Sequence, residues 1–142
     1  MKLANTFTFF ATLLTSVSAF TAGFDTVYDD PSRSLSSVAC SDGFNGLLTR
    51  GFTTFGSLPK YPHIGGAPAV TGWNSTGCGT CWNLTYTNAE GTAKSINLLA
   101  MDSSANYNMP TAAMNELTNG QADSLGRVSV TDANVHPSFC GL

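Results

Sequence analysis

Two of the four cysteines and both tryptophans of this chain lie in one stretch, Gly72-Trp73-Asn74-Ser75-Thr76-Gly77-Cys78-Gly79-Thr80-Cys81-Trp82. A disulfide between Cys78 and Cys81 would close so short a loop that it would remove little entropy from the unfolded chain. Each is therefore expected to pair with Cys40 or Cys140, in either of two arrangements. Both arrangements close loops of roughly 40 and 60 residues, each of which stabilises the fold by about 3–5 kcal/mol. The stretch is thus a double anchor for the chain on either side.

The amino terminus has the pattern of a secretory signal peptide. Lys2 supplies a positive charge, residues 7–14 form a mostly apolar run too short to span a bilayer, and Ala19 ends a run of small residues. The sequence predicts cleavage after Ala19, which leaves residues 20–142 as a single secreted domain without a membrane anchor. A buried helix is the alternative, but the stretch has no polar face at helical spacing. Four cysteines in a secreted chain then predict two disulfides.

The composition limits the classes of partner. Charged residues make up 11% of the chain and its formal net charge is −3, so the surface must consist mainly of Ser, Thr, Asn and Gly. Such a surface suits uncharged hydroxyl-rich polymers or adsorption at interfaces. The chain has no basic patch for nucleic acid. No metal or cofactor is predicted, because His63 and His136 lack ligand spacing and no βαβ pattern surrounds the Cys-Gly-Thr-Cys motif.

Short stretches of alternating polarity predict a mainly β protein. The predicted strands are residues 24–28, 34–40, 82–86, 94–101 and 126–133, with a hairpin turn at 88–91 and one helical turn at 45–50. A helix is predicted to begin near Pro110 and to end at Asn119-Gly120. Glycine and proline are frequent in residues 52–72, which predicts a long packed loop. The pattern as a whole indicates a small β-barrel with helical decoration.

A series of motifs extends over the predicted mature chain. They include Tyr28-Asp29-Asp30, Ser32-Arg33-Ser34-Leu35, Cys40-Ser41-Asp42-Gly43-Phe44-Asn45-Gly46-Leu47, Ile64-Gly65-Gly66, Gly72-Trp73-Asn74-Ser75, Cys78-Gly79-Thr80-Cys81-Trp82, Leu117-Thr118-Asn119-Gly120 and Cys140-Gly141-Leu142. In their order and spacing they resemble the cerato-platanin family of secreted fungal proteins. The resemblance implies a six-stranded double-psi β-barrel with one or two short helices. It also implies the disulfides Cys40–Cys78 and Cys81–Cys140.

The resemblance also implies a function. Cerato-platanins bind chitin and N-acetylglucosamine oligomers, loosen cellulose without clear hydrolysis, and occur in the cell wall and culture fluid. They elicit plant defence responses, which implies a plant receptor as a further partner, and they assemble at air–water interfaces. By resemblance we expect a monomeric, extracellular, expansin-like carbohydrate-binding protein. A surface-active film or recognition protein without a sugar function is the alternative.

Hydrolysis of a glycosidic bond would need two suitably spaced carboxyl groups. Asp102, at the end of a predicted strand, is similar to the groove aspartate of the related endoglucanases and expansins. No second carboxylate stands out, although Asp29, Asp30 and Asp42 could fold near the groove. We therefore expect a non-hydrolytic protein in which Asp102 binds sugar hydroxyls or caps loop amides. A weak endoglucanase-like activity that uses Asp102 is the alternative.

Sugar binding needs flat aromatic faces together with hydrogen-bonding side chains. The predicted carbohydrate-binding residues are Tyr28, Asp30, Asn45, Gly46, Trp73, Asn74, Ser75 and Asp102. Trp82 is expected instead to pack beside a disulfide. Two sequons, Asn74-Ser75-Thr76 and Asn83-Leu84-Thr85, make Asn74 and Asn83 candidates for N-glycosylation.

Overall fold

The computed structural model describes residues 4–9 and 20–142. The predicted signal peptide and its cleavage site after Ala19 lie outside the described residues, apart from residues 4–9, which have no regular secondary structure. None of the helices in the described part is both long and apolar enough to cross a membrane.

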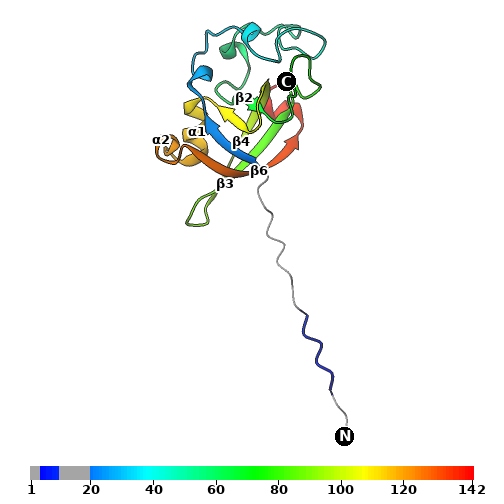
Figure 1. The fold of residues 1–142 in the computed structure, drawn as a ribbon, viewed down its shortest axis with the longest axis vertical. Helices are drawn as coiled ribbons and strands as arrows, with labels where there is room; N and C mark the ends of the chain where they lie inside the picture. Colours follow the sequence, from blue (N-terminus) through cyan, green and yellow to red (C-terminus); the bar gives the residue numbers. More distant parts are fainter. Residues whose placement is uncertain (1–3, 10–19) are drawn as a thin grey trace.

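Six strands close into a barrel in the spatial order β1-β5-β2-β4-β3-β6 (Figure 1). The strands are β1 (Phe20–Phe24), β2 (Ile64–Ala67), β3 (Cys81–Thr87), β4 (Ala93–Ser103), β5 (Tyr107–Met109) and β6 (Arg127–Val135). The helices are α1 (Thr111–Thr118) and α2 (Ala122–Leu125), with 3-10 turns η1 (Thr26–Tyr28), η2 (Leu35–Ser37), η3 (Phe55–Ser57) and η4 (Pro137–Cys140). The six-stranded barrel with short helices is confirmed.

Two parallel pairs, β1 with β5 and β2 with β4, interrupt an otherwise antiparallel barrel. The short strand β2 reaches its place only because it is rich in glycine. A β-carbon on Gly65 would lie 1.9 Å from the carbonyl oxygen of Asn108 in β5, and the register to β4 shifts between Gly65 and Gly66. This close approach explains why a strand occurs inside the 52–72 region, where the sequence predicted only a loop.

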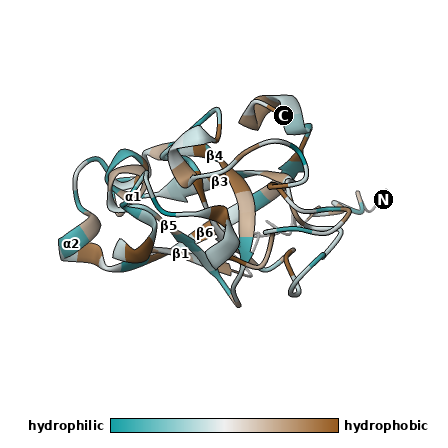
Figure 2. Ribbon diagram, turned by 90° about the horizontal axis from the view of Figure 1, so that it is seen from above, coloured by the Kyte–Doolittle hydropathy of each residue, from teal (hydrophilic) through white to brown (hydrophobic). Residues whose placement is uncertain are grey.

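The hairpin of β3 and β4 is the most regular part of the fold and confirms the strands expected at 82–86 and 94–101. At its tip the side-chain oxygen of Asn88 accepts hydrogen bonds from the backbone N–H groups of Glu90 and Thr92. β4 is buried on both faces from residue 98 to 101, because α1 and η4 pack against it from outside the barrel. Figures 1 and 2 show α1 and α2 together on one side of the barrel and the carboxyl terminus on the other.

The predictions for the first forty residues of the domain were wrong in type. Only Phe24 of the strand expected at 24–28 lies in a strand, as the last residue of β1. It is followed by η1, where the Asp25 carboxylate accepts the N–H of Val27. The strand expected at 34–40 is the 3-10 turn η2, where the Ser34 hydroxyl accepts the N–H of Ser36. In both places a short polar side chain satisfies the backbone locally and replaces a strand ladder. The helical turn expected at 45–50 is a series of non-helical turns.

Towards the carboxyl terminus the predictions hold. The strand expected at 126–133 is β6, and the helix expected after Pro110 is α1, which ends at Asn119 in the left-handed conformation with φ of 56°. β5 and α2 were not predicted, because they are only three and four residues long and too short to show a periodic pattern.

The disulfides are Cys40–Cys78 and Cys81–Cys140, with Cα–Cα distances of 5.4 and 5.7 Å. They confirm the pairing that the family resemblance implies. All four cysteines are buried, and their bonds join positions 38 and 59 residues apart. Cys78 thus holds the long connection after β1, and Cys81 holds the carboxyl-terminal tail.

Candidate functional site

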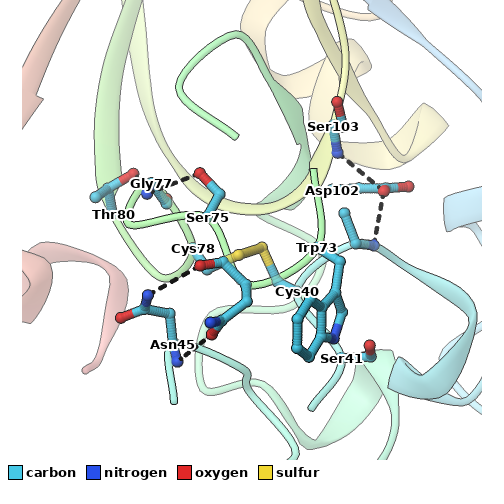
Figure 3. The surroundings of a disulfide bond; sticks show 12 residues. Cys40, Ser41, Asn45, Trp73, Ser75, Gly77, Cys78, Thr80, Asp102 and Ser103 are labelled. Carbon is cyan, nitrogen blue, oxygen red and sulfur yellow. Dashed lines mark hydrogen bonds between the residues drawn. A yellow bond between two sulfur atoms is a disulfide. The ribbon is translucent and has the colours of Figure 1, made fainter. Parts of the chain in front are cut away.

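Figure 3 shows four of the predicted site residues around the Cys40–Cys78 disulfide: Asn45, Trp73, Ser75 and Asp102. The backbone N–H of Cys40 donates to the carbonyl of Met101, and that of Ala39 donates to Oδ1 of Asp102. The chain that follows reaches Asp42, which contacts Trp73. One short segment therefore connects the aspartate that ends β4 with the loop that carries Trp73.

Asp102 is held by three protein donors. Its Oδ1 accepts the N–H groups of Ala39 and Ser103 at 3.0 and 2.9 Å, and its Oδ2 accepts the Tyr28 hydroxyl at 3.0 Å. Burial raises the pKa of Tyr28 above its ordinary value, and the neighbouring Asp102 charge raises it further. The Tyr28 ring is only 5% exposed, so it has no face to offer to a ligand. In this arrangement Asp102 caps loop amides, which is one of the two roles expected for it from the sequence.

The other carboxylates near the groove are committed to separate partners. Asp29 accepts the N–H and the hydroxyl of Thr111 at the start of α1. Asp30 accepts from Ser32, whose hydrogen bonds lower the pKa of this exposed carboxylate. Neither shares a hydrogen-bond donor with Asp102. Within residues 4–9 and 20–142, no three His, Cys, Asp or Glu side chains gather in a way that could hold a metal ion.

Trp73 presents its indole ring to solvent and is fixed from behind. The side chain is 63% exposed, and its Nε1 donates a 2.7 Å hydrogen bond to Oδ1 of Asp42. This bond is the main reason that the pKa of Asp42 is lowered. An exposed ring that is held in one orientation loses little conformational entropy when a ligand stacks on it.

Phe44 follows Gly43 in the sequence and is 90% exposed. The indole of Trp73 lies against Gly43, where a β-carbon would lie 3.1 Å from Cζ2 of Trp73 and 2.7 Å from Oδ1 of Asn74. Gly43 also has a φ of +84°, which favours glycine. Phe44 was not among the predicted site residues. A large apolar side chain inside a Gly- and Asn-rich turn is the signal that could have identified it.

Asn45 and Asn74 lock the two loops together. The backbone N–H of Asn45 donates to Oδ1 of Asn74, and Nδ2 of Asn45 donates to the carbonyl of Asn74, both at 3.0 Å. Ser75 accepts the N–H groups of Thr71 and Gly77 and so shapes the same turn. Oδ1 of Asn45 and Nδ2 of Asn74 have no partner within the described residues, so both remain available to a ligand.

The predicted set therefore divides into three groups. One group lies in two loops that contact each other and comprises Asn45, Gly46, Trp73, Asn74 and Ser75. With Asp42, Gly43 and Phe44 added, we call this group the Trp73 loop cluster. Tyr28 and Asp102 form the buried pair beside it. Asp30 lies in a separate turn with Ser32.

Gly46, a member of the predicted set, is structural, and so is Trp82, which lies outside that set. A β-carbon on Gly46 would lie 2.3 Å from the carbonyl oxygens of Ser41 and Asp42, so this residue lets the turn close. Trp82 is half-buried, donates from Nε1 to Thr80, and lies with its ring 6.4 Å from that of Tyr107. Its packing role agrees with the expectation.

The two sequons differ in their surroundings. Asn74 lies in the Trp73 loop cluster in the left-handed conformation, with φ of 57°. Asn83 lies in β3 between two partner strands, where its Nδ2 donates to Oδ1 of Asn97 at 2.9 Å.

Comparison with known proteins gives consistent matches over the domain. The family model described as Cerato-platanin matches residues 20–142. The heat-stable 19 kDa antigen of Coccidioides immitis is 50% identical over 120 residues, which cover 84% of this chain and 79% of that protein. Cerato-platanin of Ceratocystis fimbriata f. sp. platani is 33% identical over 127 residues, which cover 86% of this chain and 90% of that protein.

Solved structures agree. The crystal structure of cerato-platanin 1 from M. perniciosa matches with a TM-score of 0.82 and 46% identity, over 86% of this chain and 99% of that one. The solution structure of the fungal elicitor Cerato-Platanin matches with a TM-score of 0.72 and 34% identity, over 84% of this chain and 95% of that one.

Proposed function

This chain belongs to the cerato-platanin family, and we propose that it is a secreted, non-hydrolytic protein that binds chitin and N-acetylglucosamine oligomers in the extracellular space and the cell wall. The observation that carries the proposal is the anchored, exposed indole of Trp73. Its flat face can stack on a sugar ring, and the exposed Phe44 adds an apolar side chain to the loop that contacts the indole. Asn45 and Asn74 supply amide groups for the sugar hydroxyls and the acetamido group.

The contacts of Asp102 support a binding role over a hydrolytic one. A general acid must carry a proton, whereas the Asp102 oxygens accept hydrogen bonds from Ala39, Ser103 and Tyr28. The three candidates for a second carboxylate, Asp29, Asp30 and Asp42, are bonded to Thr111, Ser32 and Trp73 respectively. Loosening of a polysaccharide would then follow from competition for contacts between its chains, without bond cleavage.

The experiment that tests binding is a quantitative pull-down of the chain on insoluble chitin, cellulose and xylan. We expect retention on chitin, weaker retention on cellulose, and a clear loss in Trp73→Ala. Phe139→Ala is the matched control, because Phe139 is similarly exposed, at 60%, but lies in η4. Equal retention of the Trp73→Ala and Phe139→Ala variants would contradict the proposed site.

A reducing-sugar assay on the same polymers tests the absence of hydrolysis. We expect no product above that of heat-treated protein. Product that increases with time and is lost in Asp102→Asn would support the alternative of a weak glycoside hydrolase.

The proposal includes an elicitor role, since one of the similar solved structures is that of a fungal elicitor. A plant receptor would be the partner. Infiltration of leaves with wild type and Trp73→Ala separates the two activities, because a defence response that persists without sugar binding indicates recognition at another surface.

Adsorption at interfaces is a second candidate function. The observation in its favour is the set of large apolar side chains that are exposed in the domain, which are Phe44, Trp73, Leu125 and Phe139. Surface tension of dilute solutions tests it, and Phe44→Ser with Phe139→Ser should weaken the effect.

A further inference from the structure

A cleft of about 620 Å³ lies between the tip of the β3–β4 hairpin and the helices α1 and α2. It does not coincide with the Trp73 loop cluster. Lys94, near the start of β4, lines the cleft, whereas Asp102 lies eight residues further along the same strand. At about 3.3 Å per residue these positions are about 26 Å apart. Figure 1 accordingly shows the hairpin below the barrel and the loops after β1 above it.

The floor of the cleft is apolar. Leu117 of α1 is 1% exposed and belongs to the core, and the half-buried ring of Tyr86 packs against the same core. Leu125, at the end of α2, is 38% exposed. Tyr86 therefore offers an aromatic surface to a ligand and Leu125 an aliphatic one, whereas Leu117 closes the cleft from behind.

Three amide side chains surround this floor. Asn88 is oriented by its own turn, because its Oδ1 accepts two backbone N–H groups, and its Nδ2 has no partner within the described residues. Asn119 is fixed at the end of α1 by its left-handed backbone. The side-chain amides of Asn119 and Gln121 make no hydrogen bond in the part of the chain that the structure describes. Donors and acceptors are thus both available at the rim.

The charges of the cleft balance. It is lined by one cation, Lys94, and one anion, Glu90, and neither forms an ion pair among the described residues. Such a lining favours neither an anionic nor a cationic ligand. An apolar floor, converging amides and no net charge are the features of a site for a neutral, hydroxyl-rich molecule, and the volume lies in the range of roughly 300–1,000 Å³ that small-ligand sites have.

From this geometry we infer that the cleft is a second binding site, specific for a short neutral saccharide of one or two rings. Tyr86 and Leu125 contact the apolar faces of the sugar, and Asn88, Asn119 and Gln121 bind its hydroxyl groups. The inference does not depend on sugar binding at the Trp73 loop cluster. If both sites bind saccharide, one molecule can contact two polymer chains from opposite ends of its barrel.

The test is a titration of the isotope-labelled protein followed by backbone amide chemical shifts, with N,N′-diacetylchitobiose and cellobiose as the probes. We expect saturable shifts at Asn88, Asn119 and Gln121 with at least one of the two. The double variant Asn119→Gly with Gln121→Ala should weaken the affinity at the cleft about fivefold or more. Glycine suits the left-handed conformation at position 119, so the variant removes the amide without strain. Trp73→Ala should leave the affinity at the cleft unchanged.

The inference is overturned if the cleft amides show no saturable shift with either disaccharide at tens of millimolar. It is also overturned if glycerol produces the same shifts, or if the double variant binds as wild type does. Leu125→Trp gives a second readout, since a folded variant with a filled cleft should lose these shifts. Shifts confined to the cleft would support this inference and contradict the function proposed above, and shifts confined to the Trp73 loop cluster would do the reverse.

Discussion

The hydroxyl of Tyr28 donates a 3.0 Å hydrogen bond to Oδ2 of Asp102 and so joins the turn after β1 to the end of β4, 74 positions away in sequence. The other oxygen of the same carboxylate caps Ala39, one residue before the first disulfide. Asp102 therefore holds together the segments from which the Trp73 loop cluster extends. A variant of Asp102 changes the support of the proposed site as well as its chemistry.

The first prediction concerns the stability that Asp102 contributes. Asp102→Ala leaves the Tyr28 hydroxyl and the Ala39 N–H without their acceptor, and should lower the free energy of unfolding by about 1–3 kcal/mol. Asp102→Asn keeps one oxygen and should cost less. Asp30→Ala is the control, because that exposed carboxylate bonds only within its own turn, and should change stability by about 0.5 kcal/mol or less. Urea denaturation measures all three; an Asp102→Ala variant as stable as Asp30→Ala would contradict the supporting role.

The second prediction is a loss of stability at alkaline pH. Burial is the largest cause that raises the pKa of both Tyr28 and Tyr107 in the folded state, and the carboxylate bonded to each hydroxyl raises it further. Folding therefore favours the protonated phenols. Their contribution is fully present below the unfolded-state pKa of about 10 and is lost as the pH rises towards the folded-state pKa values.

Above pH about 10, each of these tyrosines should lower the free energy of unfolding by up to about 1.4 kcal/mol per pH unit. Denaturation of wild type, Tyr28→Phe and Tyr107→Phe between pH 9 and 11, about one unit either side of that pKa, measures the slope. Each variant should be flatter than wild type in this range. Parallel curves for wild type and both variants would show that these phenols ionise alike in the folded and unfolded states.

The third prediction tests the crossing of β2 and β5. Gly65→Ala places a β-carbon 1.9 Å from the Asn108 carbonyl oxygen, well inside van der Waals contact with the backbone of β5. We expect the variant to be recovered poorly or to unfold at much lower urea. Gly51→Ala is the matched change, because Gly51 has a φ of +95° but nothing within 4 Å of its β-carbon, and should cost only about 1–2 kcal/mol. Similar losses in the two variants would mean that the strands do not approach as described.

The fourth prediction concerns glycosylation. Asn74 lies in a turn and its Nδ2 has no partner among the described residues, whereas Asn83 lies in β3 between β4 and β6 and is bonded to Asn97. We expect Asn74 to carry the N-glycan when the chain is secreted from a glycosylating host. Thr76→Ala removes this sequon without touching Asn74, and should lower the intact mass by one glycan in addition to the mass of the substitution. Thr85→Ala should change the mass by the substitution alone. The reverse pattern in intact-mass spectrometry would contradict the assignment.

The glycan at Asn74 would also lie next to the indole of Trp73. The Thr76→Ala protein should therefore bind chitin oligomers more tightly than the glycosylated wild type. Equal binding would show that the glycan points away from the Trp73 loop cluster.

Where side chains alternate or a capping residue stands at a defined place, the sequence predicted the element. β3, β4, β6 and α1 are examples, since Trp82 to Tyr86 alternates and Asn119-Gly120 marks the end of the helix. The strand β2 could not be predicted, because a Gly-Gly pair has no side-chain pattern and is fixed by its approach to Asn108. The turns η1 and η2 resembled strands, since Asp25 and Ser34 cap the chain locally in a way that depends on the tertiary fold.

The prediction of the site was correct where its residues contact a neighbouring motif. It was wrong where the exposure of a side chain depends on how the loops cover it. The proximity of Asn45 to Asn74 follows from the Cys40–Cys78 bond that lies between their loops. The burial of Tyr28 and the exposure of Phe44 do not follow from residue type, because both are set by which loops cover the end of β4. The cleft beside α2 could not be foreseen either, since α2 itself was not predicted.

The most direct measurement of sugar binding at the Trp73 loop cluster is a titration of wild type and Trp73→Ala with N,N′,N″,N‴-tetraacetylchitotetraose, followed by backbone amide chemical shifts. We predict saturable shifts at Phe44, Asn45 and Asn74 in the wild type. Loss of the stacking ring should cost about 1 kcal/mol or more, so Trp73→Ala should bind about fivefold more weakly or not at all. Unchanged affinity in a folded Trp73→Ala protein, or shifts that avoid these three residues, would contradict the proposed binding site.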